Sequence, residues 1–244
     1  MGAFSLTVAG HTAAVRSLFE STSVYLSAYV TENEPEFTIT VTPEDLVFEQ
    51  AELAREAEEE GFRPRIFTDP FLERAAIQRK MAEYLFDRDV VLFHGSTVAV
   101  DGYAYLFTAP CGTGKSTHTR LWRQVFGERA LMVNDDKPFL ALTEQGVVAY
   151  GTPWSGKHGL DTNIAVPLAG ICILERGKEN RVERISPREV LPFLLKQGLR
   201  PLEEAKGPLY EEKIRRLSCA VPLWRMQCNK DPEAAKVAFE AMHP

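Results

Sequence analysis

Short apolar stretches, several of them alternating with polar residues, recur along the chain and predict β-strands. Near the N-terminus, residues 4–8 alternate strictly and residues 37–42 are rich in β-branched side chains, while residues 12–30 are ambiguous between helix and strand. Tight-turn residues at Asp101-Gly102 and Glu144-Gln145-Gly146 predict two hairpins. From residue 90 onward the predicted strands are 90–94, 96–100, 103–108, 130–134, 139–142, 147–150, 166–174, 181–185 and 221–226.

Apolar residues at helical spacing predict helices between these strands. Thr42 as N-cap and Pro43 at the first position begin a helix that extends to Glu60. A second helix follows Asp69-Pro70 and runs to residue 86. Ser186-Pro187-Arg188-Glu189 is a capping box that begins a later helix. The remaining predicted helices span residues 115–126, 208–218 and 231–242, and the helix after the capping box ends near residue 197.

The character of the chain changes near residue 87, where closely spaced strands begin. We therefore expect a small α+β N-terminal region over residues 1–86 and a larger α/β domain with a mixed sheet over residues 87–244. No linker rich in Pro, Gly or Ser separates them. The N-terminal region contains no motif that indicates chemistry.

Composition excludes several classes of protein. The 244 residues have a net charge of −6, which disfavours nucleic acid as a partner. No apolar run approaches the roughly 18 residues that span a bilayer, so no membrane segment is expected. The four cysteines show no CxxC pairing, which favours reduced thiols in a cytoplasmic protein over a disulfide framework or a zinc site. The sequence leaves homo-oligomerisation open.

The strand at residues 103–108 leads into a glycine-rich loop, and the loop opens a helix that begins Lys-Ser-Thr. Glycines let consecutive backbone N–H groups turn inward, and the helix N-terminus adds partial positive charge. This is the construction of a phosphate loop, in which Lys115 reaches the β/γ-phosphates and Ser116 contacts Mg²⁺. Ala109 stands where the usual pattern has glycine. The residues expected to bind nucleotide are Cys111, Gly112, Thr113, Gly114, Lys115, Ser116 and Thr117.

Two adjacent carboxylates end the apolar strand that follows the loop helix. Asp135-Asp136 begins 20 residues after Lys115, which leaves room for one helix and one strand. Because Mg²⁺ is usually held by one or two carboxylates with phosphates and water, one aspartate can hold the metal while the other accepts a proton from a hydroxyl. The strand entering the loop belongs to a hairpin, whereas standard nucleotide-binding units use helical crossovers. This disfavours small GTPases and ordinary ATPases.

Residues 151–157 spell a second GxxxxGK. No Ser or Thr follows Lys157, and the glycine and aspartate beyond it make an immediate helix unfavourable, so a second nucleotide loop is rejected. This polar loop instead supplies candidate contacts for the acceptor or the γ-phosphate, namely Trp154, Lys157 and His158. The alternative is a surface connection between two strands.

His94-Gly95, the hairpin at Asp101-Gly102, the phosphate loop and Asp135-Asp136 follow one another in an order that resembles the catalytic core of HPr kinase/phosphorylase. That family shares its kinase fold with ATP-dependent phosphoenolpyruvate carboxykinase. The resemblance covers about residues 90–175 and is weaker to about residue 240. It implies a mixed-sheet P-loop kinase core in which ATP and Mg²⁺ support transfer of the γ-phosphoryl group to a serine-like hydroxyl.

The same resemblance implies roles for individual residues. Lys115 and Ser116 would hold phosphate and metal, and His94 would lie near the transferred phosphate. Of Asp135-Asp136, the first is the candidate base and the second the candidate metal ligand together with Ser116, although the opposite order stays open.

The resulting functional hypothesis is an ATP- and Mg²⁺-dependent kinase with an unidentified hydroxyl-bearing acceptor, which is a peptide, a protein or a small molecule. Thr117 stands where HPr kinase has glutamate, and that family's signature for its protein substrate is absent. HPr as the acceptor and the reverse phosphorylase reaction therefore stay open. The alternatives are a nucleotide-binding regulatory module without transfer activity and a phosphoenolpyruvate carboxykinase-like enzyme.

Overall fold

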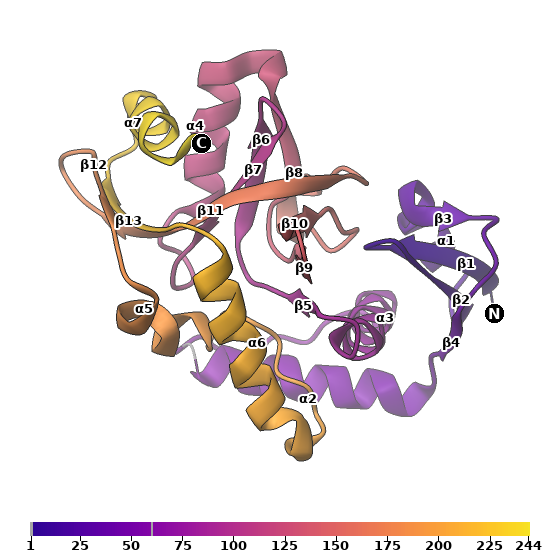
Figure 1. The fold of residues 1–244 in the computed structure, drawn as a ribbon. Helices are drawn as coiled ribbons and strands as arrows, with labels where there is room; N and C mark the ends of the chain where they lie inside the picture. Colours follow the sequence, from indigo (N-terminus) through magenta and orange to yellow (C-terminus); the bar gives the residue numbers. More distant parts are fainter. Residues whose placement is uncertain (1, 60) are drawn as a thin grey trace. The chain divides into compact units, whose positions relative to one another are not determined.

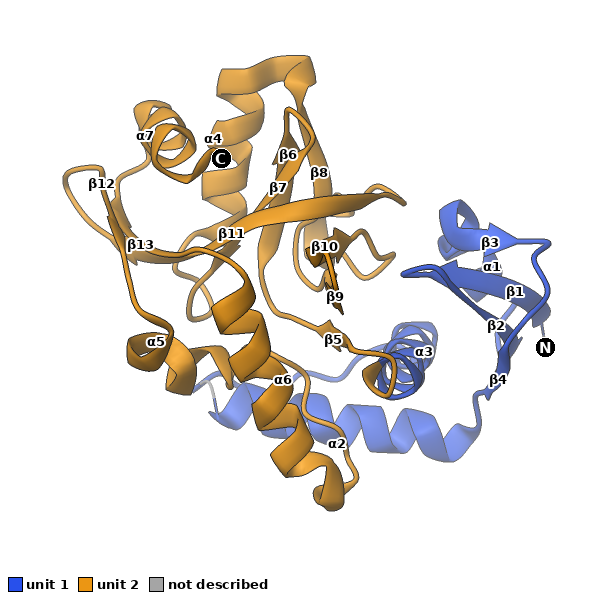
Figure 2. Ribbon diagram, viewed as in Figure 1, with its two compact units in different colours: residues 1–85 blue, residues 86–244 orange. Residues whose placement is uncertain are grey.

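A computed structural model describes residues 2–59 and 61–244 (Figure 1). The chain forms two compact units, one ending at Leu85 and one spanning Phe86–Pro244 (Figure 2). Each unit has its own sheet and its own helices, and each is described separately below.

The N-terminal unit contains a four-stranded sheet with the order β3-β1-β2-β4. The β1–β2 hairpin turns at Ala9 and Gly10, both with positive φ (52° and 81°), as a two-residue turn matched to strand twist requires. β4 pairs parallel to β2. Its strands are β1 (Gly2–Val8), β2 (His11–Ser17), β3 (Val30–Thr31) and β4 (Phe37–Thr40), and its helices are α1 (Ser21–Tyr25), α2 (Pro43–Glu59) and α3 (Asp69–Phe86, whose last residue belongs to the second unit). The ambiguous residues 12–30 thus form strand, helix and strand in turn.

Charged contacts fix α2 within this unit. Asp45 accepts hydrogen bonds from the backbone N–H of Thr42 (2.9 Å) and from its hydroxyl (3.4 Å), which confirms the predicted helix start. On α3, Arg79 contacts Asp45 at 3.1 Å and Glu49 at 2.6 Å. The predicted last helical residue, Glu60, lies outside the described residues.

The second unit is built on a nine-stranded mixed sheet that curls, with the path β5-β9-β10-β11-β7-β6-β8. β13 extends it from β11, and β12 pairs with β13. Both predicted hairpins are confirmed, because β6 pairs antiparallel with β7 and β9 with β10. The strands are β5 (Val90–Leu92), β6 (Ser96–Val100), β7 (Tyr103–Thr108), β8 (Ala130–Asn134), β9 (Phe139–Thr143), β10 (Gly146–Tyr150), β11 (Ala165–Arg176), β12 (Arg181–Arg184) and β13 (Leu223–Cys228).

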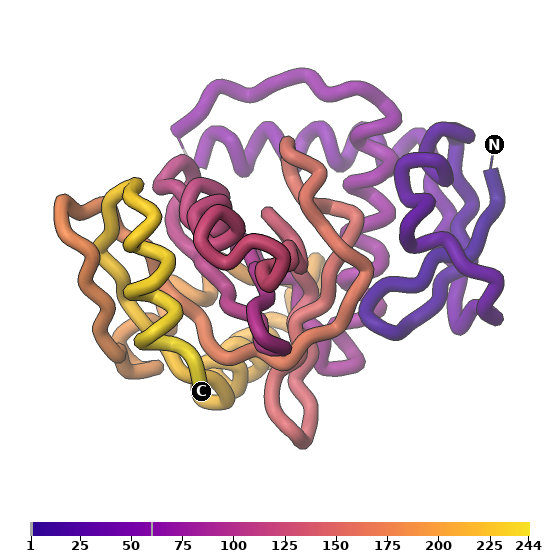
Figure 3. Tube along the Cα trace, turned by 90° about the horizontal axis from the view of Figure 1, so that it is seen from above, coloured from indigo at the N-terminus to yellow at the C-terminus, as the bar shows by residue number. Residues whose placement is uncertain are grey.

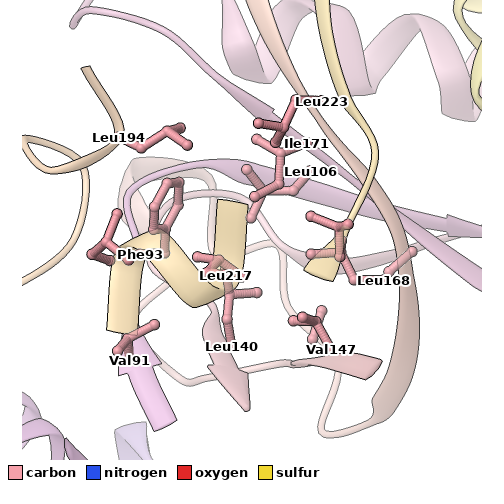
Figure 4. Packing of buried hydrophobic residues seen from close by; sticks show 14 of the residues in the cluster. Val91, Phe93, Leu106, Leu140, Val147, Leu168, Ile171, Leu194, Leu217 and Leu223 are labelled. Carbon is pink, nitrogen blue, oxygen red and sulfur yellow. The ribbon is translucent and has the colours of Figure 1, made fainter. Parts of the chain in front are cut away.

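Helices cover both faces of this sheet. Along β7, Ala104 and Leu106 point to one face while Tyr105 and Phe107 point to the other. The first face packs against α5 and α6 (Figure 4), and the second against α4 and α7, which lie side by side in Figure 3. The helices are α4 (Lys115–Phe126), α5 (Pro187–Leu194), α6 (Gly207–Ala220) and α7 (Glu233–Met242).

Several predicted ends differ from the observed ones by up to three residues. The strand predicted over residues 90–94 ends at Leu92, and the helix predicted to residue 197 ends at Leu194. After Leu194 the N–H groups of Lys196 and Gln197 bond to carbonyls three residues back, at 3.0 and 2.9 Å, and the Gln197 carbonyl accepts from the His94 N–H at 2.7 Å. This backbone therefore pairs with the segment after β5. β13 starts at Leu223 and not at residue 221, because Pro222 has no N–H to donate to a strand ladder.

Candidate functional site

The phosphate loop connects β7 to α4 through two glycines with positive φ, Gly112 at 73° and Gly114 at 126°. Side chains are strained in these conformations, so the loop geometry requires glycine there. Within the loop, the Thr113 N–H donates to the Pro110 carbonyl at 3.2 Å. α4 begins at Lys115, and the first N–H groups of a helix have no partner within it. The junction thus offers backbone donors and a helix N-terminus to an anion.

Lys115 is folded back across the loop. Its ammonium donates to the Ala109 carbonyl at 3.0 Å, and its side chain is only 8% exposed. Ala109 is fully buried, and its methyl group belongs to the hydrophobic cluster beneath α4. This packing accounts for alanine at a position where the usual pattern has glycine.

Arg176, at the end of β11, contacts the backbone of the phosphate loop. Its guanidinium donates to the Gly112 carbonyl at 2.7 Å and approaches the Thr113 carbonyl at 3.5 Å. β11 runs parallel to β7, so its last residue reaches the same edge of the sheet as the loop. The contact uses loop carbonyl oxygens and leaves the loop N–H groups for a ligand.

The topology brings the loop and the paired aspartates together. β7 and β8 flank β6 and both pair antiparallel with it, so they run in the same direction and end at the same edge. Thr97 of β6 lies opposite Leu106 on one side and Asn134 on the other. Asp135-Asp136 therefore begins at the same edge of the sheet as the phosphate loop, and only β6 lies between the two strands that lead to them.

Asp135 is buried and linked to α4 by two hydroxyl groups. Its side chain is 5% exposed, and its Oδ1 accepts from the Ser96 hydroxyl at 2.6 Å. Ser96 Oγ lies 2.8 Å from Thr119 Oγ1 on α4. Since the single Ser96 proton goes to the carboxylate, Thr119 is the donor in the second hydrogen bond. This chain couples Asp135 to the helix that carries Lys115.

Asn134 holds the turn that follows β8. Its Oδ1 accepts from the backbone N–H groups of Asp136 (2.8 Å) and Lys137 (2.6 Å). Its amide donates to the carbonyl and hydroxyl of Thr152, each at 2.9 Å. The Thr152 hydroxyl in turn donates to the Lys137 carbonyl at 2.8 Å. One fully buried amide thus fixes both the turn and the neighbouring loop.

Asn134→Ala should lower the free energy of unfolding by about 3 kcal/mol, because it leaves buried N–H and carbonyl groups without partners. Asn134→Asp is the matched control: it keeps the acceptor for the two N–H groups but loses the amide donors to Thr152. We expect a comparable loss of stability for this variant in thermal unfolding, because its new carboxylate is fully buried and faces the Thr152 carbonyl. An alanine variant as stable as the wild type would contradict the assigned role.

The side chains of Asp136 and His94 lie close together at the edge of the sheet that carries the site. Asp136 Oδ1 lies 3.5 Å from His94 Nε2, and the two side chains are 35% and 27% exposed. Burial, and then the charges of Lys115 and Lys137, lower the pKa of His94 to about 3. The ring is therefore neutral at neutral pH, so the contact joins an imidazole to a carboxylate and is not an ion pair.

The loop after β10 lies against the aspartates. A Cβ built on Gly156 would lie 3.2 Å from the Asp136 Cβ, which shows how closely the loop backbone approaches this carboxylate. Trp154, a predicted substrate-loop residue, is buried, and its ring packs edge-on against Phe139 with 6.4 Å between the ring centroids. This contact packs the loop onto the fold. Lys157 and His158 are exposed, as a contact role requires.

The segment that follows α5 contacts the end of β7, directly before the phosphate loop. The Thr108 hydroxyl lies 3.0 Å from both the His94 carbonyl and the Gln197 side-chain oxygen. The Gln197 carbonyl also accepts from the His94 N–H. His94 is thereby fixed by its backbone beside the last residue of β7.

The structure brings together most of the predicted site. Lys115, His94 and the paired aspartates share one sheet edge, and Cys111 is exposed on the loop as a free thiol. Sequence reasoning missed the residues that hold this arrangement, which are Ser96, Thr119, Asn134, Thr152 and Gln197. The one local signal was Asn134, a polar residue at the end of an apolar strand.

The residues present fit a nucleotide with Mg²⁺. Ser116 in the first turn of α4 and the carboxylates of Asp135 and Asp136 are hard oxygen donors of the kind Mg²⁺ prefers. Among residues 2–59 and 61–244, no three His, Cys, Asp or Glu side chains gather into a metal-binding group. Mg²⁺ needs no such cluster, because it takes one or two carboxylates and completes its shell with phosphates and water.

No protein-family model matches the chain, and no curated protein matches it. Among solved structures, it is similar to the HPr(Ser) kinase/phosphatase from Coxiella burnetii, at 12% sequence identity over 62% of this chain and 89% of that chain. The TM-score is 0.36, so this is a distant structural relationship. The roles of individual residues therefore depend on the geometry of this chain.

In the part of the chain that the structure describes, no helix is long and apolar enough to cross a membrane.

Proposed function

We propose that this protein is an ATP- and Mg²⁺-dependent kinase that transfers the γ-phosphoryl group to a hydroxyl acceptor. The observation that supports this most is the shared edge of the sheet. Lys115 lies across the phosphate loop at the end of β7, and Asp135-Asp136 follows β8, with only β6 between these two strands. The motif order that resembles HPr kinase/phosphorylase implies the same type of P-loop kinase core.

Lys115 and the loop N–H groups would bind the phosphates. Lys115 supplies a buried positive charge, and the helix N-terminus adds to it. Mg²⁺, when bound, neutralises charge on the phosphate oxygens. Ser116 and Asp135 would hold it.

The two aspartates differ in burial, and this supports the opposite order to that implied by the resemblance. Asp135 is 5% exposed and has one oxygen committed to Ser96, and its link through Thr119 ties it to the phosphate-loop helix. Such a fixed carboxylate suits a metal ligand. Asp136, 35% exposed, is the carboxylate that an acceptor can reach.

Asp136 would therefore be the base. The acceptor hydroxyl loses its proton to Asp136 as its oxygen bonds to the γ-phosphorus; the bond to the bridging oxygen breaks, and ADP leaves. The neutral imidazole of His94 would orient Asp136 through its N–H. Because the ring carries no charge, it does not compete with Lys115 for the phosphates.

Purified protein with labelled ATP and Mg²⁺ tests the proposal, with a lysate as the source of acceptors. We expect Mg²⁺-dependent nucleotide binding and transfer of label to an acceptor or, slowly, to water. Tight Mg·ATP binding with no labelled acceptor and no ADP release would contradict transfer and favour a nucleotide-binding module. Protein that binds no nucleotide at all would contradict the whole proposal.

A further inference from the structure

Lys137 is a cation on a rigid backbone directly after Asp136. Its N–H is held by Asn134 at 2.6 Å, and its carbonyl by Thr152 at 2.8 Å. The preceding carbonyl, that of Asp136, accepts from the Gly95 N–H at 2.9 Å. The side chain is partly exposed, and within the described residues its ammonium has no hydrogen-bond or ion-pair partner.

Three other lysines of this unit are used by the protein itself. Lys115 bonds to the Ala109 carbonyl, Lys213 pairs with Asp89, and Lys206 pairs with Asp87 at 2.9 Å. Lys137 is as firmly anchored through its backbone as any of these, yet its charge makes no such contact. A charge held in place directly after Asp136 and without a protein partner is available to a ligand of opposite sign.

More positive charge stands on the adjoining loop. The Gly156 backbone approaches Asp136, and the next two residues, Lys157 and His158, are exposed. The charge of Lys137 acts on His94 from the same region, since it contributes with Lys115 to the lowered pKa of that ring. Lysines therefore stand directly after Asp136 and next to Gly156, which approaches Asp136, although the chain as a whole has a net charge of −6.

An acceptor hydroxyl reaching Asp136 would meet two carboxylates and the phosphates of ATP, all of which repel an anion. Local cations offset that repulsion and give an anionic group on the acceptor a partner of opposite sign. We propose that the phosphoryl acceptor is an anion whose carboxylate or phosphate, next to the hydroxyl, pairs with Lys137. This inference rests on the proposed function, because it takes Asp136 as the position of the hydroxyl.

Two anions of defined chemistry test the inference by calorimetry: malonate for a carboxylate and inorganic phosphate for a phosphate. Each is titrated into protein saturated with Mg²⁺ and a non-hydrolysable ATP analogue, so that the phosphate loop is filled. We expect binding of at least one anion, weakened about tenfold in Lys137→Gln and retained in Lys137→Arg. The anion that binds more tightly identifies the acceptor's charged group.

Lys230→Gln is the matched control, because Lys230 is exposed and lies outside the site. It should bind both anions as the wild type does. The inference is overturned if the wild-type protein binds neither anion, or if Lys137→Gln binds them as tightly as the wild type. Failure of the proposed function is seen separately, in the titration with the ATP analogue alone.

Discussion

Replacing Asp136 with asparagine should lower the rate of phosphoryl transfer by about 10²- to 10⁴-fold, the contribution expected of a positioned general base. The amide keeps the size of the side chain but cannot accept the hydroxyl proton. Asp136 is partly exposed and its backbone is held by Asn134 and Gly95, so the variant should fold normally. Nucleotide affinity, measured with a fluorescent ATP analogue, should change by less than about threefold, since the loop proposed to bind phosphate is untouched.

Asp135→Asn is the comparison that separates the two roles. As a metal ligand, Asp135 should mainly affect the Mg²⁺ concentration needed for nucleotide binding, which the same fluorescent titration measures. If Asp135→Asn instead abolishes transfer with an unchanged Mg²⁺ requirement, and Asp136→Asn shifts that requirement, then the order implied by the family resemblance is correct. Full activity in both variants would remove the pair from the mechanism.

The elements closest to the chemistry could be predicted from the sequence because their signals are local. α4 begins and ends at the predicted residues, and so does β8. The glycines at 112, 114 and 127 all have positive φ, which is the property that made them reliable markers of loop and helix end. The hairpin at Asp101-Gly102 has both residues at positive φ, as its turn type requires.

The contacts that position the site could not be predicted, because they join residues far apart in the sequence. Ser96 and Thr119 are 23 residues apart, and only the pairing of β6 between β7 and β8 brings the serine to Asp135. Arg176 reaches Gly112 across 64 residues, because β11 runs parallel to β7. Apart from the two hairpins, which their turn residues mark, alternation and spacing do not show which strands become neighbours.

Trp154 illustrates a different difficulty. An aromatic residue in a polar loop suggests a contact surface, but the loop folds back so that this side chain is covered and packs against Phe139 of β9. Gly151 shows how tightly the start of the loop packs: a Cβ there would lie 1.8 Å from the Thr162 carbonyl. The loop is thus a packed structure whose exposed residues are 156–159 and Asn163.

Lys115→Met should have the second large effect on phosphoryl transfer. It tests the role of the phosphate loop, whereas Asp136→Asn tests the general base. Methionine keeps an unbranched side chain of similar length in a site that is 8% exposed, but it removes the ammonium that spans the loop. We expect phosphoryl transfer to fall about 10²- to 10³-fold, the loss typical of removing one preorganised electrostatic contact. Unlike Asp136→Asn, this variant should also bind the fluorescent nucleotide about tenfold more weakly.

Thermal unfolding without nucleotide provides the control for Lys115→Met, because burial of an apolar side chain in place of a charge should not destabilise the fold. Stabilisation by added Mg·ATP should be reduced, since the rise in stability on ligand binding depends on the ratio of free ligand to its dissociation constant. A methionine variant with wild-type turnover and wild-type nucleotide affinity would show that the loop does not bind the phosphates. In that case the shared sheet edge would need another explanation, and the assignments of Asp135 and Asp136 would lose their basis with it.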